Sequence, residues 1–336
     1  MTTRKIALTG IKPSGTPHVG NYLGMLKPAL ELATTYQAYY FIADYHALTT
    51  VTNGDDMRHL TYEVAATMLA LGLNPDEVIF FRQSDIPELF EFTWILSCFA
   101  PKGLLNRAHA YKARVDDNLA AGRPPDDGIN MGLFTYPVLM SADILMYGSH
   151  IVPVGQDQKQ HVEIARDLAI AFNNNYGDIL VVPEAVIRED VAVIPGVDGR
   201  KMSKSYGNVL PLFAPAKELR KAVMRIVTDS RPPEEPKNPD ENNVYNIYKH
   251  FATPAQLAEM RTGFQHGGLG YGTAKQMLYE LLEAQFGPAR AEYDRLLANP
   301  AHLDTVLLAG AQKARAVATP MLARLRRAVG VGGLAT

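Results

Sequence analysis

The sequence has little cysteine and little net charge. Cys98 is the only cysteine among 336 residues, which excludes an intrachain disulfide framework and a zinc site built from clustered cysteines. The formal net charge is -2, so the chain as a whole does not attract nucleic acid, and any RNA contact must come from local basic patches. We therefore expect a protein of the reducing cytoplasm.

Long apolar runs are also missing. No stretch is long and apolar enough to span a bilayer, and the first residues show no signal-peptide pattern. We expect neither secretion nor contact with a membrane. Apolar residues nevertheless make up 47% of the chain, which is enough for the core of one large or two ordinary globular domains.

Strand-like and helix-like segments alternate through the first half of the chain. Segments with apolar residues at helical spacing separate short apolar runs at residues 6–8, 38–43, 78–81, 151–154 and 179–182. This alternation predicts an α/β fold with a doubly wound, Rossmann-like parallel sheet, which binds ligands beyond the carboxyl ends of its strands. A surplus of apolar residues at 87–121 is a candidate subunit interface.

The pattern changes to helices beyond Pro211. These helices are broken at residues 230–236 and 267–272, where proline and glycine are frequent. We therefore expect a Rossmann-like catalytic domain over residues 1–207 and an all-helical domain over residues 208–336.

Residues 9–24 lead from the first strand-like segment into a helix through a turn rich in glycine and proline. Glycine allows the backbone to approach a ligand where a side chain would collide. The unpaired amides and the dipole of the helix N-terminus favour an anion, with His18 and Asn21 within reach. The stretch predicts a phosphate-binding turn, although an ordinary strand-to-helix loop has the same glycine spacing.

A second stretch, residues 199–208, places Lys201 and Lys204 on either side of a small turn. Ammonium groups on long stems suit a leaving pyrophosphate, because they can follow the developing charge. A solvated basic loop is the alternative. Together, His18-Val-Gly-Asn21 and Lys201-Met-Ser-Lys-Ser205 resemble the two signature motifs of the class I aminoacyl-tRNA synthetases.

Residues 135–147 are the third informative stretch. Pro137 is expected in the first turn of a helix, and Tyr136, Met140 and Asp143 then share one helical face. Asp143 stands among apolar residues, and a buried carboxylate needs a donor. That donor is either a bound ligand or an internal cation, and the spacing leaves both open.

Residues 151–161 lead from a strand to a helix N-terminus at the same edge of the sheet. Asp157 could bind ribose hydroxyls or cap the helix, and Gln158 could accept from an ammonium group. His46 and His161 lack partners at metal spacing, so we expect structural histidines and no metal held by the protein.

At this point the resemblance narrows to the tryptophan-specific class I synthetases and covers nearly the whole chain. It implies that Asp143 accepts the indole N–H, and that Tyr136 and Gln158 contact the amino group. It further implies pocket positions for the residues His46, Met140, Val152 and Val154.

The resemblance also implies the nucleotide site. The catalytic residues are His18, Lys201 and Lys204, and ATP is expected to contact Lys12, Pro13, Ser14, Gly20, Asn21, Gly155, Gln156, Asp157, Val193, Lys201, Met202, Ser203, Lys204 and Ser205. Three positions depart from the family, which usually has glutamine at Lys12, glutamate at Gln156 and glutamine at Tyr45. Lys12 adds a positive charge beside the expected phosphates or substrate carboxylate.

The implied reaction activates L-tryptophan with ATP and Mg²⁺ and transfers it to tRNA(Trp), in a homodimer whose helical domain reads the anticodon. Two basic runs at residues 217–221 and 324–327 either contact tRNA phosphates or are simply solvated. The alternatives are a tyrosine-specific synthetase, a small-molecule adenylyltransferase and a catalytically idle paralogue that senses tryptophan.

Overall fold

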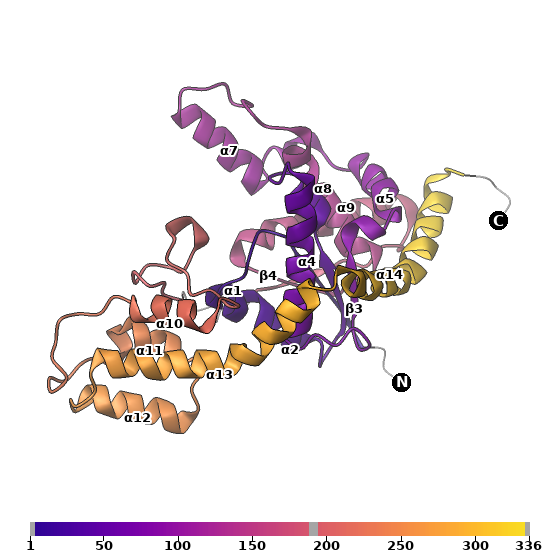
Figure 1. Cartoon of the computed structure of the whole chain (residues 1–336). Helices are drawn as coiled ribbons and strands as arrows, with labels where there is room; N and C mark the ends of the chain where they lie inside the picture. Colours follow the sequence, from indigo (N-terminus) through magenta and orange to yellow (C-terminus); the bar gives the residue numbers. More distant parts are fainter. Residues whose placement is uncertain (1–3, 188–193, 333–336) are drawn as a thin grey trace.

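A five-stranded parallel sheet forms the centre of the molecule (Figure 1). The computed structural model describes residues 4–187 and 194–332. The strand order is β3-β2-β1-β4-β5, and every neighbouring pair is parallel. The strands are β1 Ile6–Ile11, β2 Gln37–Ile42, β3 Ile79–Arg82, β4 Ile151–Val154 and β5 Glu184–Ile187. The predicted doubly wound parallel sheet is therefore confirmed.

The order of the strands reverses at β1. From there the chain adds β2 and β3 on one side and, later, β4 and β5 on the other. The carboxyl ends of β1 and β4 consequently flank the crevice in which doubly wound sheets bind their ligands. Gly155 follows β4 at this edge, and the turn that leads to His18 follows β1.

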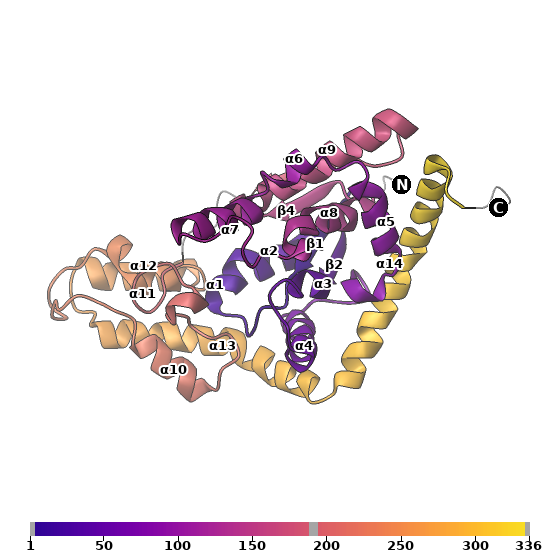
Figure 2. The same cartoon turned by 90° about the horizontal axis from the view of Figure 1, so that it is seen from above.

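Helices lie on both sides of the sheet (Figure 2). The first, α1 Val19–Asn21, continues through a π-helical turn, η1 Tyr22–Leu26, into α2 Lys27–Leu32. The longer helices are α4 Gly54–Ala70, α5 Glu88–Ser97, α7 His109–Ala120, α8 Met131–Met146 and α9 Lys159–Tyr176. Short helical segments are α3 Asp44–Ala47, η2 Gln83–Asp85, α6 Lys102–Leu105, η3 Gln156–Gln158, η4 Lys204–Tyr206 and η5 Pro239–Glu241.

The C-terminal part is helical, as predicted. It comprises α10 Ala216–Met224, α11 Asn243–Tyr248, α12 Pro254–Gln265, α13 Tyr271–Leu297 and α14 Pro300–Val329. Helices α10 to α13 gather at one end of the molecule, whereas α14 runs back along the sheet to β3 (Figure 1). The division at residue 207 stays a prediction. None of the helices in the described ranges has the length and apolarity that crossing a bilayer requires.

Two predicted elements are wrong. Residues 179–182 are not the last strand, because the end of α9 already uses their backbone: Asn173 accepts from the Ile179 and Leu180 amides and donates to the Leu180 carbonyl. The strand begins only after Pro183. Likewise α8 begins at Met131, well before Pro137, because Asn130 caps it by accepting from the Leu133 amide at 2.9 Å.

Candidate active site at the sheet edge

His18 closes the turn after β1 and caps α1. Its Nδ1 accepts from the Asn21 amide at 3.2 Å, while the Asn21 side chain accepts from the His18 amide at 3.1 Å. His18 is buried, and this desolvation, followed by the charge of Lys204, lowers its pKa to about 4. His18 is therefore neutral at pH 7. Because Nδ1 is an acceptor, its proton is on Nε2.

The structure brings the two signature segments together. The Val19 amide donates to the Leu210 carbonyl at 2.9 Å, and the Leu212 amide donates to the Pro17 carbonyl at 3.1 Å. Lys204 Nζ donates to the Ser14 carbonyl oxygen at 3.0 Å. Although the lysine is exposed, partial desolvation lowers its pKa. Lys204 of the segment 199–208 thus contacts the turn in residues 9–24 for which phosphate binding was predicted.

Asn208 holds the second segment in shape, and the sequence reasoning missed it. The residue is 1% exposed. Its Oδ1 accepts from the Ser203 amide at 2.8 Å, and its Nδ2 donates to Asp198 at 2.7 Å and to the Lys201 carbonyl at 3.1 Å. Gly196 permits this arrangement, since a Cβ there would lie 2.4 Å from the Asn208 side chain. In the sequence, only the glycines around Lys201 and Lys204 indicated a tightly packed loop of this kind.

Two contacts and the exposure of the side chains describe the other predicted ATP residues. Lys12 Nζ donates to Thr49 Oγ1 at 3.3 Å, and the Gly20 amide lies 3.3 Å from the buried sulfur of Met202. Pro13 is buried, whereas Ser14, Gly155, Gln156, Lys201 and Ser205 are exposed. Val193 and the Asp157 side chain lie outside the described residues. A cavity under this turn is lined by Ile11, Lys12, Ser14, Gly15, Pro17, Asn21, Met25, Leu26, Glu63, Val64, Thr67 and Lys204.

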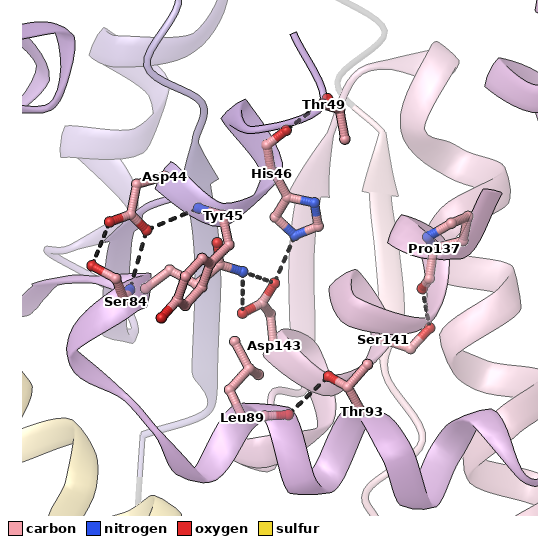
Figure 3. A network of polar contacts seen from close by, with 11 residues as sticks. Asp44, Tyr45, His46, Thr49, Ser84, Leu89, Thr93, Pro137, Ser141 and Asp143 are labelled. Atoms are coloured by element: carbon pink, nitrogen blue, oxygen red, sulfur yellow. Dashed lines mark hydrogen bonds and ion pairs between the residues drawn. The ribbon is translucent and has the colours of Figure 1, made fainter. Parts of the chain in front are cut away.

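Asp143 is buried in α8 and is 3% exposed. Gln83 Nε2 donates to both carboxylate oxygens, and His46 Nε2 lies 2.9 Å from Oδ2. Figure 3 shows His46 pointing from α3 toward this carboxylate. Burial raises the pKa of Asp143, while the bonds from His46 and Gln83 act in the opposite direction. The donor that a buried carboxylate needs is therefore supplied from α3 and η2.

Tyr136 and Gln158 meet through His161. The Tyr136 hydroxyl lies 2.6 Å from His161 Nε2, and His161 Nδ1 lies 3.1 Å from Gln158 Oε1. The His161 side chain is buried. Of the predicted pocket walls, Val152 is buried, and Met140 and Val154 pack against the same core cluster.

Gln83 and the pair Asp44 and Ser84 are further residues that the sequence reasoning missed. Asp44 accepts from the Ser84 amide at 3.1 Å and from the Tyr45 amide at 3.0 Å, which fixes α3 against η2 (Figure 3). Gln83 follows β3 at the same sheet edge as His46. The sequence could have indicated Gln83 by its position directly after a buried strand, because the carboxyl ends of parallel strands meet at the ligand-binding edge of the sheet.

Metal-ligating side chains do not cluster at this edge. Throughout residues 4–187 and 194–332, no group of three or more histidine, cysteine, aspartate or glutamate residues is arranged to hold a metal ion.

The parallel sheet, the capped turn and the lysine loop define a nucleotide-dependent synthetase of class I. The family described as "tRNA synthetases class I (W and Y)" matches residues 2–287, and the chain belongs to this family. A protein of Pseudomonas aeruginosa named Tryptophan--tRNA ligase is 52% identical over 99% of this chain and 75% of its own. A namesake from Pseudomonas putida is 54% identical over 98% of this chain and 74% of its own.

A solved structure agrees with these relatives. The tryptophanyl-tRNA synthetase of Campylobacter jejuni, crystallised with ADP and tryptophan, has a TM-score of 0.89 and 44% identity, over 97% of this chain and 100% of that one. The likeness therefore extends through the C-terminal helices.

Proposed function

We propose that this protein joins L-tryptophan to tRNA(Trp) with ATP, through a tryptophanyl-adenylate, and releases AMP and diphosphate. The observation that carries the proposal is the buried carboxylate of Asp143 beside the edge where the two signature segments meet. The identity of about half the residues with proteins named Tryptophan--tRNA ligase supports the same substrate. A tyrosine-specific enzyme is not favoured.

The first step needs no covalent bond to the protein. A carboxylate oxygen of tryptophan attacks the α-phosphorus of ATP, the bond to the bridging oxygen breaks, and diphosphate leaves. Lys201 and Lys204 compensate the charge that develops on the departing oxygens. His18 serves as a neutral donor through Nε2, because its pKa lies near 4. Mg²⁺ bound to ATP would supply further positive charge against the phosphates, in addition to that of Lys201 and Lys204.

In the second step, a ribose hydroxyl of the terminal adenosine of tRNA attacks the activated carbonyl carbon. The ester bond forms as the bond between the carbonyl carbon and the phosphate oxygen breaks, AMP leaves with that electron pair, and the proton of the hydroxyl passes to the departing phosphate. Tyr136 and Gln158 hold the amino group of tryptophan throughout. Both side chains contact His161 and so lie close together, which supports this assignment.

Selectivity follows from the buried acceptor. A site built to receive an N–H rejects an analogue without it by about 10⁴ or more, because the acceptor is then left unpaired. Phenylalanine is excluded in this way. Tyrosine carries a hydroxyl that could donate to Asp143, so the length of the pocket, set by Met140, Val152 and Val154, completes the discrimination.

The molecule acts as a homodimer in the cytoplasm. Phe90 and Trp94 stand one helical turn apart on α5 and are 50% and 71% exposed. Aromatic side chains of this size are rarely left in water, and an interface with a second copy would cover them. The helical region α10 to α13 is the proposed contact for the anticodon.

Pyrophosphate exchange with each of the twenty amino acids tests the proposal. We expect exchange with L-tryptophan alone, and tryptophan-dependent charging of purified tRNA(Trp). Asp143→Ala should abolish exchange with tryptophan while ATP still binds. Exchange with tyrosine instead would identify the sister specificity. Adenylate formation without transfer to tRNA would point to an adenylyltransferase, and absence of both reactions to an idle paralogue.

A further inference from the structure

Gln83 reaches the Asp143 carboxylate from the turn η2, directly after β3. Its Nε2 donates to Oδ1 at 2.9 Å and to Oδ2 at 2.8 Å. Gln83 is 1% exposed, so water does not compete for this amide. A donor shared by both oxygens fixes the plane of the carboxylate, whereas a bond to one oxygen would leave the group free to turn.

The other end of the amide shows why Gln83 has this orientation. Its Oε1 is buried and has no hydrogen-bond partner within the part of the chain that the structure describes. A buried carbonyl without a donor is costly, and a glutamine that served packing alone would pair both ends. Turning the amide over would place Oε1 against a negative charge. The carboxylate of Asp143 therefore decides the orientation.

The two carboxylate oxygens of Asp143 differ in how many further hydrogen bonds they can accept. His46 Nε2 lies 2.9 Å from Oδ2, so Oδ2 meets both His46 and Gln83. Among the described residues, Oδ1 accepts from Gln83 only. Because each carboxylate oxygen can accept two hydrogen bonds, Oδ1 retains room for a further N–H.

We propose that Gln83 is a positioning residue that sets the amino-acid specificity, by holding the Asp143 carboxylate turned so that Oδ1 receives the indole N–H. The inference rests on the proposed function, in which Asp143 recognises the indole. Gln83 acts through the carboxylate and does not itself touch the substrate. Without it, Asp143 keeps His46 as a donor but loses the group that fixes its plane.

The ionisation of Asp143 reports on this contact. The titratable and polar groups that act on Asp143 are His46 and Asp44 on α3 and Gln83 on η2. Tyr147 at the end of α8 feels the charges of Asp143 and of Glu88 on α5. His161 on α9 contacts the Tyr136 hydroxyl. Burial and the charge of Asp44 raise the pKa of Asp143, and the bonds from His46 and Gln83 lower it. Loss of the Gln83 donor therefore raises this pKa further.

Gln83→Met removes the donor and nearly keeps the volume. We expect kcat/KM for tryptophan in pyrophosphate exchange to fall about 10- to 100-fold, as for a lost hydrogen bond to a charged group. The acid limb of its pH profile should move to higher pH. A tryptophan isostere with sulfur in place of the indole N–H should lose little, so the preference for tryptophan over this isostere collapses. KM for ATP should not change.

Gln83→Glu should reverse the pH dependence. Two adjacent carboxyl groups share a proton, and the shared acid donates to Asp143 as the amide did. As the pH rises, this proton is lost and the two charges repel. The variant should therefore be most active at low pH and gain an alkaline limb in kcat/KM for tryptophan.

Gln285→Met is the matched control, because Gln285 donates to the Tyr22 hydroxyl at 3.2 Å, outside the pocket. It should leave the pH profile unchanged. The proposal is overturned if Gln83→Met loses activity equally with tryptophan and the sulfur isostere. It is also overturned if the pH profiles of kcat/KM for both Gln83 variants have the same acid and alkaline limbs as the wild type. If Gln83→Met does not fold, the Gln83→Glu profile alone decides. Failure of the proposed function differs, since the wild-type protein would then show no exchange with tryptophan.

Discussion

Lys204 is the residue through which the second signature segment acts on the first. Its Nζ reaches the Ser14 carbonyl oxygen, and a Cβ at Gly15 would lie 3.3 Å from the same nitrogen. A cation at this turn is held where phosphates are expected, so Lys204→Ala should slow adenylate formation about 10²-fold or more. Single-turnover kinetics measure this rate, and equilibrium titration should give an unchanged affinity for tryptophan. Lys217→Ala, on the exposed face of α10, is the control. An unaltered single-turnover rate in the Lys204 variant would remove its role.

His18 makes the stability of the protein depend on pH. Its pKa is about 4 in the folded state and near the ordinary 6.5 in the unfolded state, so between these values the unfolded state binds more protons. The contribution of His18 is complete above pH 6.5 and is lost as the pH falls toward 4. His18→Asn can still cap α1 but does not titrate.

The free energy of unfolding in urea, compared for the two proteins at pH 7 and pH 4.5, tests this dependence. We expect the advantage of the wild type over His18→Asn to shrink by about 2 kcal/mol at the lower pH. Comparing the two proteins cancels the contributions of Asp44 and Asp143, whose raised pKa values act with the opposite sign. An advantage that stays constant with pH would contradict the neutral, buried state of His18.

Among single residues, those inside a local motif were predictable and those chosen by tertiary contacts were not. His18, Asn21 and Lys204 stand in short patterns whose chemistry can be read directly. Gln83 has an ordinary side chain, and its importance comes from Asp143, a distant partner that folding brings to it. Asn208 was missed although its partners are close in sequence, because an asparagine in a loop has no distinctive pattern. The sequence also predicted that Asp143 needs a donor, but not that Gln83 and His46 are the donors.

Helix α14 is attached to the sheet by an unusually close approach. A Cβ at Gly310 would lie 1.7 Å from the Phe80 carbonyl oxygen on β3, so only glycine allows this contact. Gly310→Ala should therefore destabilise the protein by about 3 kcal/mol or more. Gly272→Ala on α13 meets nothing within 4 Å and should be neutral or stabilising by up to about 1 kcal/mol. Urea denaturation of both variants measures the difference, and equal stabilities would contradict the close approach.

Helix α14 is also connected, through Arg82, to the turn η2 beside Asp143. Asp304 on α14 accepts from Arg82 Nη1 at 2.7 Å, and Arg82 Nε donates to Asp85 at 2.9 Å. These contacts enclose the turn η2, which carries Gln83. The sequence predicted helices after Pro211, but the return of α14 to β3 depends on long-range contacts that no local pattern encodes. The start of α8 and the last strand were mispredicted for a different, local reason, because hydrogen bonds between the side chains of Asn130 and Asn173 and nearby backbone decide them.

At the scale of the whole molecule, the exposed aromatic side chains of α5 are not fully covered within the described part of one chain. Trp94 is 71% exposed, and Phe90 beside it also contacts the Tyr45 ring, with 4.7 Å between ring centroids. Both side chains leave apolar area in water that a second copy would remove, at about 25 cal/mol per Å². The expected dimer therefore depends on α5.

Trp94 makes this proposal measurable, because it is the only tryptophan in the chain. Without added tryptophan, fluorescence at low protein concentration should show the red-shifted emission of water-exposed indole, and the emission should shift to the blue as dimers form. Trp94→Asp places a charge in the interface and should give monomers in sedimentation equilibrium. Lys313→Asp on α14 changes a surface charge elsewhere and should remain dimeric. A wild-type protein that stays monomeric at all concentrations, with red-shifted emission throughout, would rule out a dimer built on α5.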